Sequence, residues 1–246
     1  MYLQNNNFYS MNDDFEFIIS TLKSMASVDH FEKLKRFGIN QKTALGVKIP
    51  DIRSLAKDIG VNSDLASQLL ATDIHEAKIL ASIIDDPKQL TEEKVEQYIS
   101  KFDSWDVCDL SSELIFNSIY SDKLIISLHA NKEEFRKRTA FVLMCYNAVH
   151  NKKALDNQFL EYLKIIENEA WDERNFVRKA VNWALRQIGK RNIFLHQKAI
   201  ECAKRIQQQP FKSAKWIASD ALRELHNEKI ISRLRSKEIL LEKHKL

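Results

Sequence analysis

Hydrophobic residues recur along most of the chain at the three- and four-residue spacing of amphipathic α-helices. Several segments open with residues that favour helix N-caps, including Asn62 before SDLASQLL and Thr91 before EEK. Pro50 lies where the first turn of a helix tolerates proline, and Gly60 lies where that helix would end. The pattern predicts helices at 13–27, 29–37, 50–59, 62–71, 74–85, 90–102, 104–120, 122–130, 132–147, 152–168, 173–190, 193–207, 211–225 and 228–242.

Turn-forming residues are rare in this chain: its 246 residues include only 4 Gly and 3 Pro. A fold with many strands needs such residues at short intervals. The rest of the composition is rich in good helix formers such as Ala, Leu, Lys and Glu. We therefore expect an all-α fold. Hydrophobic residues make up 44% of the chain and the net charge is only +4, which excludes wholesale disorder.

Two internal matches indicate repetition. The string ALRQI at 184–188 recurs as ALREL at 221–225, and FRKRTAFVL at 135–143 resembles FVRKAVNWA at 176–184. Helix pairs that repeat at about 40 residues are typical of HEAT-like or armadillo-type arrays. Such arrays stack into a curved right-handed solenoid whose concave face is a binding groove. Because the repeats match only loosely, a helical bundle stays open as an alternative.

Three cysteines, Cys108, Cys145 and Cys202, lie far apart and form no C-x-x-C motif or zinc spacing. We expect them to be reduced, partly buried thiols of a cytoplasmic protein. The chain has no apolar run long enough to span a membrane and no signal-peptide core. Its polar opening predicts a flexible extension at 1–12, followed by a single repeat domain at 13–246.

Positive charge is concentrated towards the C-terminus. Residues 171–246 carry 18 Lys and Arg against 8 Asp and Glu, a net charge of +10. Residues 1–170 carry 20 basic and 26 acidic residues, a net charge of −6. Such an imbalance suggests a polyanionic partner for the C-terminal third.

Two tryptophans and one aspartate are the candidate chemical residues. Trp105 and Asp109 are four residues apart in SWDVCDLSSELI, so they share one face of a helix. Trp183 lies in the middle of the helix formed by KAVNWALRQIGKRN. Spacing alone also fits a structural role, because a helical tryptophan is usually part of the core and Asp109 could form an ion pair with Arg138.

Five strings make the chain recognisable: GVKIPDIRSLAKDIG, HEAKILASIID, SWDVCD, KAVNWALRQIGKRN and WIASDALREL. Together they resemble the AlkD-like DNA alkylation repair family of HEAT-like repeat DNA glycosylases, from about Asp13 to Leu240. An arginine-bearing helix start separates the third of these strings from the fourth. The resemblance implies that the concave groove binds DNA in the bacterial cytoplasm, at the nucleoid.

The resemblance also implies site residues. The family has an aromatic–Asp–aromatic group with a nearby arginine, and these catalytic positions fall here on Trp105, Asp109, Trp183 and Arg138. The implied DNA-binding residues are Arg136, Lys137, Arg178, Lys179, Arg186, Lys190 and Arg191. Either Arg136 or Arg138 could face the groove, because the spacing around them differs from the family pattern.

These residue types suit the hydrolysis of cationic N3- or N7-alkylated purines. Loss of such a base develops oxocarbenium character on the deoxyribose, which the carboxylate of Asp109 would stabilise while it positions water. The tryptophan faces would attract the cationic lesion, and the basic residues would bind phosphates. No general acid is evident, so we expect little activity on neutral lesions. The family resemblance implies that the base stays stacked in the duplex.

We expect a monomer that binds double-stranded DNA with alkylated purines and needs no metal or cofactor. Two other functions remain open. The chain could bind damaged or branched DNA without excising a base, as some relatives do, or it could be a scaffold for a protein partner. Retention of Trp105, Asp109 and Trp183 favours the glycosylase, and the basic C-terminal third counts against the scaffold.

Overall fold

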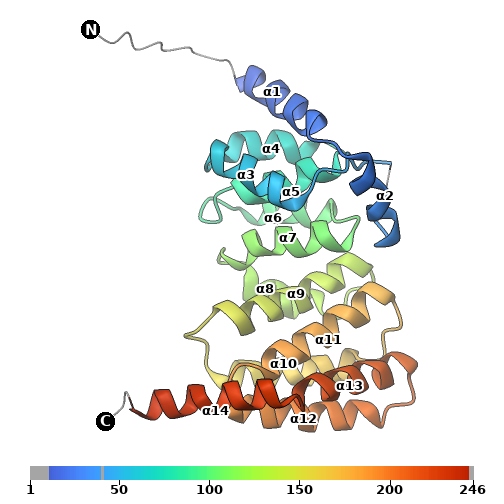
Figure 1. Ribbon diagram of the computed structural model, residues 1–246, viewed down its shortest axis with the longest axis vertical. Helices are drawn as coiled ribbons and strands as arrows, with labels where there is room; N and C mark the ends of the chain where they lie inside the picture. The colour runs from blue at the N-terminus through green and yellow to red at the C-terminus, as the bar shows by residue number, and fades with distance from the viewer. Residues whose placement is uncertain (1–10, 40–41, 244–246) are drawn as a thin grey trace. The chain divides into compact units, whose positions relative to one another are not determined.

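The computed structural model describes residues 11–39 and 42–243, and every regular element in these ranges is a helix (Figure 1). The all-α prediction is therefore confirmed. The chain forms two compact units, unit 1 up to Ser118 and unit 2 from Ile119. Most of the predicted extension at 1–12 lies outside the described residues. Within the described ranges, no helix is both long and apolar enough to cross a membrane.

Unit 1 is built around one central helix. Its helices are α1 (Met11–Ser24), α2 (Val28–Arg36), α3 (Ile49–Ile59), α4 (Ser63–Ala71), α5 (His75–Ile84), α6 (Glu92–Ser100) and α7 (Trp105–Phe116). Helix α5 packs against α3, α4 and α7, and nearly all of its residues are buried. The predicted caps are confirmed: the side chains of Asn62 and Thr91 accept the amides of Leu65 and Lys94 at 3.0 and 3.1 Å.

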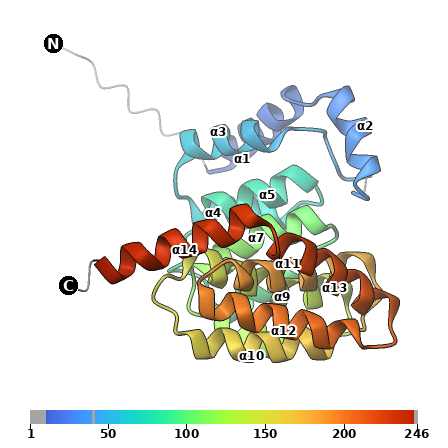
Figure 2. The same ribbon diagram turned by 60° about the horizontal axis from the view of Figure 1, so that its bottom comes forward.

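Unit 2 consists of helix pairs in two layers (Figure 2). Its helices are α8 (Ser121–Leu128), α9 (Glu134–His150), α10 (Asp156–Glu169), α11 (Asn175–Gly189), α12 (Ile193–Gln207), α13 (Lys212–Leu225) and α14 (Glu228–Lys243). One layer contains α9, α11 and α13, and the other contains α8, α10 and α12. Helix α14 packs against α12 and α13 at the end of the chain.

Polar side chains link successive repeats at the spacing expected from the sequence. In unit 2 the amide of Asn182 on α11 donates to Asp220 on α13 at 2.6 Å, 38 residues away. In unit 1 the His75–Asp106 hydrogen bond joins α5 to α7 across a shorter separation of 31 residues. The strings 184–188 and 221–225 form the ends of α11 and α13. The repeats predicted from these strings are therefore structurally equivalent.

The three cysteines form no disulfide and are fully buried, which is deeper than the partial burial expected from the sequence. Burial, together with the nearby charge of Glu167, raises the pKa of the Cys202 thiol to about 12. This thiol is therefore protonated at neutral pH. Its Sγ lies 3.4 Å from the carbonyl of Leu163, so it serves as a packed core residue between α10 and α12.

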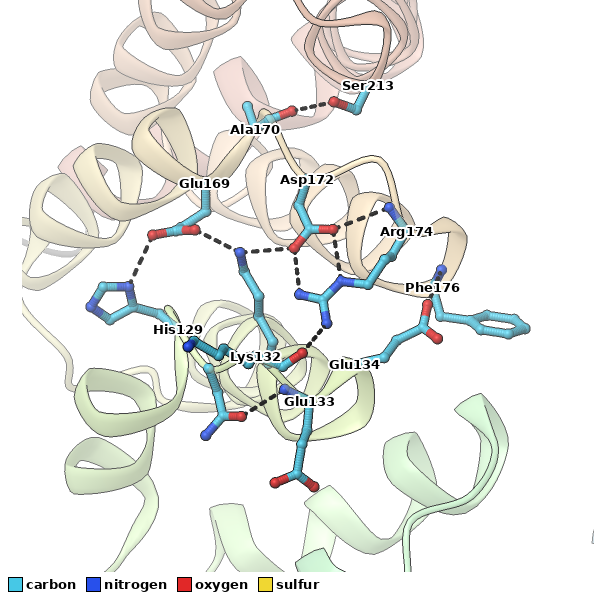
Figure 3. Close-up of polar contacts among 12 residues, drawn as sticks. His129, Lys132, Glu133, Glu134, Glu169, Ala170, Asp172, Arg174, Phe176 and Ser213 are labelled. Atoms are coloured by element: carbon cyan, nitrogen blue, oxygen red, sulfur yellow. Dashed lines mark hydrogen bonds and ion pairs between the residues drawn. The ribbon is translucent and has the colours of Figure 1, made fainter.

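A buried lysine near the start of α9 lies in the interior of unit 2. Lys137 is 1% exposed, and its Nζ lies 2.6 Å from Glu169 and 2.9 Å from Asp172. It also lies over the ring of Trp171, 4.6 Å from the centroid. Figure 3 shows the surrounding contacts, in which Arg174 approaches Asp172 at 2.6 Å. Burial raises the pKa of Asp172, but hydrogen bonds from Arg174 and Lys137 outweigh it and hold the pKa at about 2.

The expectation that Lys137 binds DNA is therefore wrong. Its ammonium group lies inside unit 2, where two carboxylates compensate its charge and a phosphate cannot reach it. A buried cation needs such partners, because desolvation without them is strongly unfavourable. Lys137 thus joins α9 to the connection between α10 and α11.

Replacing Lys137 by alanine should destabilise the protein. The change leaves Glu169 with only His129, 3.5 Å away, and Asp172 with Arg174 alone. Removal of one partner of a buried ion pair costs about 3 kcal/mol or more. Urea denaturation followed by circular dichroism would measure this loss. Lys179→Ala, at an exposed position of α11, is the control and should change the free energy of unfolding by less than about 0.5 kcal/mol. Equal unfolding midpoints for the two variants would contradict the assigned role.

Candidate functional site

Trp105 and Asp109 lie one helical turn apart at the start of α7, as the sequence predicts. Both side chains are half-buried and line the same pocket of unit 1, which has a volume of about 310 Å³. Helices α2, α5 and α7 form its walls, together with the chain that leads into α3. Most of the lining is apolar and includes Leu34, Val47 and Ile79. The pair therefore borders an apolar recess.

The indole of Trp105 is fixed by a long-range hydrogen bond. Its Nε1–H donates to the carbonyl of Phe37 at 3.0 Å, and Phe37 is the C-cap residue of α2. The two residues are 68 positions apart in the chain. One edge of the indole is thus anchored to α2 while the side chain lines the pocket.

The first turn of α7 is tied to α5 through a buried pair. His75 Nε2 and Asp106 Oδ2 are 3.0 Å apart, and their side chains are 3% and 10% exposed. Asp106 Oδ1 also accepts the amide of Val107 at 3.0 Å. Burial raises the pKa of Asp106, but the interactions with His75 outweigh it and hold the pKa below its usual value. Because Asp106 lies between Trp105 and Asp109 in the chain, this pair positions both of them.

Glu76 fixes the segment between α2 and α3, which forms one wall of the pocket. Its carboxylate accepts the backbone amides of Leu45 at 2.8 Å, Gly46 at 2.7 Å and Val47 at 3.1 Å. Gly46 has a φ of +87°, and a Cβ there would lie 2.6 Å from the carbonyl oxygen of Ser27. Only glycine fits this close approach without strain. A buried carboxylate bound by three amides makes a rigid wall.

Trp183 and Arg138 lie in unit 2. Trp183 is half-buried in the middle of α11. Arg138 on α9 is 5% exposed, and its Nη1 donates to the carbonyl of Phe176 at 2.5 Å. Arg138 thus bridges α9 and α11, whereas Arg136 is half-buried and lies 3.3 Å from Glu133.

The basic residues of α11 differ in their surroundings. Lys179 is exposed, and Arg178 lies over the ring of Trp216 at 5.1 Å. Arg186 and Lys190 both pair with Glu224 on α13, Lys190 at 2.6 Å. Burial raises the pKa of Glu224, but the hydrogen bond from Lys190 and the charges of both cations outweigh it and lower the pKa.

Arg191 has a structural role that the sequence does not reveal. Its guanidinium donates to the carbonyls of Ala148, Asn151 and Ala154 at 3.1, 2.7 and 2.9 Å. It also lies over the ring of Phe159, 4.3 Å from the centroid. Arg191 therefore fixes the connection between α9 and α10 in addition to any contact it makes with a ligand.

The residues that position Trp105 and Asp109 were not predicted. His75 and Glu76 open α5, where they look like ordinary polar residues at a helix start, and Asp106 looks like a first-turn acid. The available signal is that α5 is otherwise almost entirely buried, so polar residues at its start need partners. Among the described residues, no group of three or more His, Cys, Asp and Glu is arranged to hold a metal ion.

Paired helices in two layers, joined by hydrogen bonds at the repeat spacing, define a helical-repeat protein of the HEAT-like class. The sequence profile of the family described as "DNA alkylation repair enzyme" matches residues 18–225. The chain belongs to this family.

A solved structure supports the same fold. It is described as "a new family of proteins related to the HEAT-like repeat DNA glycosylases with affinity for branched DNA structures". The superposition has a TM-score of 0.73 at 18% sequence identity and covers 85% of this chain and 94% of that chain. A search among curated proteins finds no significant match.

Replacing Glu76 by glutamine should loosen the pocket wall. Hydrogen bonds to a charged group contribute about 1.5–3 kcal/mol each, and about 1.4 kcal/mol corresponds to a tenfold change in an equilibrium. We therefore expect the amides of Leu45, Gly46 and Val47 to exchange with deuterium at least about tenfold faster in Glu76→Gln. Glu93→Gln, at an exposed position of α6, is the matched control. Unchanged exchange at these three amides would contradict the assigned role of Glu76.

Proposed function

We propose that this protein is a monofunctional DNA glycosylase that hydrolyses the N-glycosidic bond of cationic N3- or N7-alkylated purines in duplex DNA. The observation that carries the proposal is that Trp105 and Asp109 share one turn of α7 and line one pocket. Membership of the DNA alkylation repair enzyme family supports it.

Asp109 is the carboxylate of this pocket that fits the chemistry. Two other carboxylates line the pocket, but three backbone amides hold Glu76 and His75 holds Asp106. Both are almost completely buried, so neither can approach a deoxyribose. Asp109 is half-buried, which lets it meet solvent or a ligand. Its negative charge would stabilise the oxocarbenium character that develops as the base departs, and would orient the attacking water.

The tryptophans supply binding without acid catalysis. An aromatic face attracts a cationic nucleotide. Because a hydrogen bond already anchors the indole of Trp105, this side chain loses little entropy on binding. Trp183 and Arg138 are assigned to the same reaction by the family resemblance. An alkylated purine already carries positive charge, so it leaves without a general acid. The family resemblance implies that the base stays stacked in the duplex.

The basic residues of unit 2 would bind phosphates. Lys179 is exposed and offers a direct contact. Arg186 and Lys190 pair with Glu224, and Arg186 also lies 3.7 Å from Asp220. Asp220 pairs with Arg223 as well, so three cations share two carboxylates and positive charge remains for a phosphate. Arg136, Arg178 and Arg191 complete the proposed set, from which Lys137 is excluded by its burial.

A second candidate function is binding of branched or damaged DNA without excision. The description of the similar solved structure favours it, since that family is reported to have affinity for branched DNA. Both functions use the same basic residues, so binding alone does not separate them. Release of a base separates them directly.

The test is release of 7-methylguanine from duplex DNA in single-turnover reactions. Asp109→Asn should lower the rate by roughly tenfold or more, which corresponds to about 1.4 kcal/mol of transition-state stabilisation. Glu113→Gln is the matched control, because Glu113 lies on the same helix, one turn further on, and is half-exposed beside Arg53. Its rate should equal that of the wild type. Trp183→Ala should also be slower than the wild type, since the family resemblance assigns Trp183 to the same reaction.

Three outcomes would decide between the functions. Release that depends on Asp109 but not on Glu113 supports the glycosylase. Release that is equally fast in all variants would assign the chemistry to other residues. No release by any variant, together with salt-sensitive binding of duplex or branched DNA, would make this protein a DNA-binding relative without excision activity.

A further inference from the structure

A second pocket, in unit 2, has five cations among its twelve lining residues. Its volume is about 670 Å³, within the range of about 300–1,000 Å³ that is typical of ligand sites. The ends of α9 and α11, the starts of α10 and α12, and helix α14 surround it. Its basic lining residues are Lys152, Lys190, Arg191, Arg233 and Lys237. Asp156 is the one acidic residue among the described lining residues.

Two of these five cations already have carboxylate neighbours. Lys190 pairs with Glu224 at 2.6 Å. Arg191 interacts electrostatically with Asp156, whose Oδ1 also accepts the side-chain amide of Asn192 at 2.9 Å. Glu224 and Asp156 therefore offset charge on Lys190 and Arg191, and Asp156 is the one carboxylate that the described pocket lining itself provides.

Three cations remain without a carboxylate partner in the part of the chain that the structure describes: Lys152, Arg233 and Lys237. Lys152 donates to the carbonyl of Val149, and Lys237 donates to the carbonyl of Arg191 at 3.0 Å. Carbonyl oxygens orient these ammonium groups but do not neutralise them. Burial, and then the charges of Lys152, Arg191 and Arg233, lowers the pKa of Lys237. An anion in the pocket would relieve this repulsion.

The pocket is held in shape before any ligand binds. Arg191 donates to the carbonyl of Ala148 at the end of α9 and to two carbonyls of the connection between α9 and α10. Asn192 caps α12 by accepting the amide of Leu195 at 2.8 Å. Leu234, which is 3% exposed, anchors α14 so that Arg233 and Lys237 are presented from one helix. A preformed set of cations loses little entropy when it binds an anion.

We propose that this pocket binds a phosphate group of a DNA strand, with Lys152, Arg233 and Lys237 as its ligands. The inference rests on the DNA binding assumed in the proposed function, and it adds a contact outside the residues that the family resemblance implies. Two lysines act as point charges and one arginine offers a planar fork, a combination that suits phosphate oxygens. It also gives a local explanation for part of the positive charge in the C-terminal third.

The test compares two double variants of the full chain that remove the same charge from the same helix. Arg233→Gln with Lys237→Gln alters the pocket. Lys229→Gln with Arg235→Gln removes two exposed cations of α14 that do not line it. Binding of an unmodified duplex is followed by fluorescence anisotropy between about 50 and 200 mM salt. Equal thermal midpoints would show that both variants are folded.

The pocket variant should bind the duplex at least about fivefold more weakly than the control variant, and the magnitude of its salt slope should fall by about 1 for each phosphate that it no longer neutralises. Equal affinities and equal slopes for the two variants would overturn the proposal. A second arm adds inorganic phosphate alone. If phosphate stabilises the wild type but not the pocket variant, while both variants bind duplex equally, the pocket takes free phosphate and the strand assignment is overturned.

Failure of this inference is distinguishable from failure of the proposed function. Equal binding by both variants, with base release that depends on Asp109, overturns only the pocket. Weaker binding by the pocket variant, without base release by any variant, overturns only the glycosylase. If the wild type binds no duplex at any salt concentration, both the strand assignment and the proposed function are overturned.

Discussion

A pair of helices from this chain cannot bury its apolar face alone, so each repeat depends on contact with the next. The polar contacts follow the same rule, since many of them join residues one repeat apart, as Asn182 and Asp220 do in unit 2. Lys137 is the extreme case, because its charge is tolerable only where Glu169 and Asp172 meet it. Packing between repeats therefore determines which charged residues are structural and which can meet a ligand.

The same constraint shapes the candidate site in unit 1. His75 and Asp106 join α5 to α7 and so set the direction of the helix turn that carries Trp105 and Asp109. The three carboxylates at the pocket differ in exposure, because Glu76 and Asp106 are almost completely buried and Asp109 is half-buried. One carboxylate binds backbone amides, one binds a histidine, and the third is half-buried at the recess. Identical chemical groups thus acquire different contacts and exposure from their positions in the repeats.

Much of the fold follows from local patterns in the sequence. Helical spacing, scarce turn residues and caps such as Asn62 predict the helices, and recurring strings predict the repeats. The pairing of charges does not follow from local patterns, because Glu169, whose carboxylate pairs with the buried Lys137, lies 32 residues away in the chain. The sequence of the basic triplet 136–138 near the start of α9 does not show which of its side chains face solvent and which face the core. The pocket at Trp105 was likewise not predictable, since its walls come from three separate segments.

The most direct measurement of the central claim compares two lesions with different charge. Single-turnover release of 7-methylguanine, whose leaving base is cationic in DNA, is measured beside release of hypoxanthine, which is neutral. A site that acts through a carboxylate without a general acid predicts release of 7-methylguanine and no measurable release of hypoxanthine. Comparable rates for both bases would contradict this mechanism, because they would require a group that protonates the leaving base. Release of neither base would contradict the glycosylase itself.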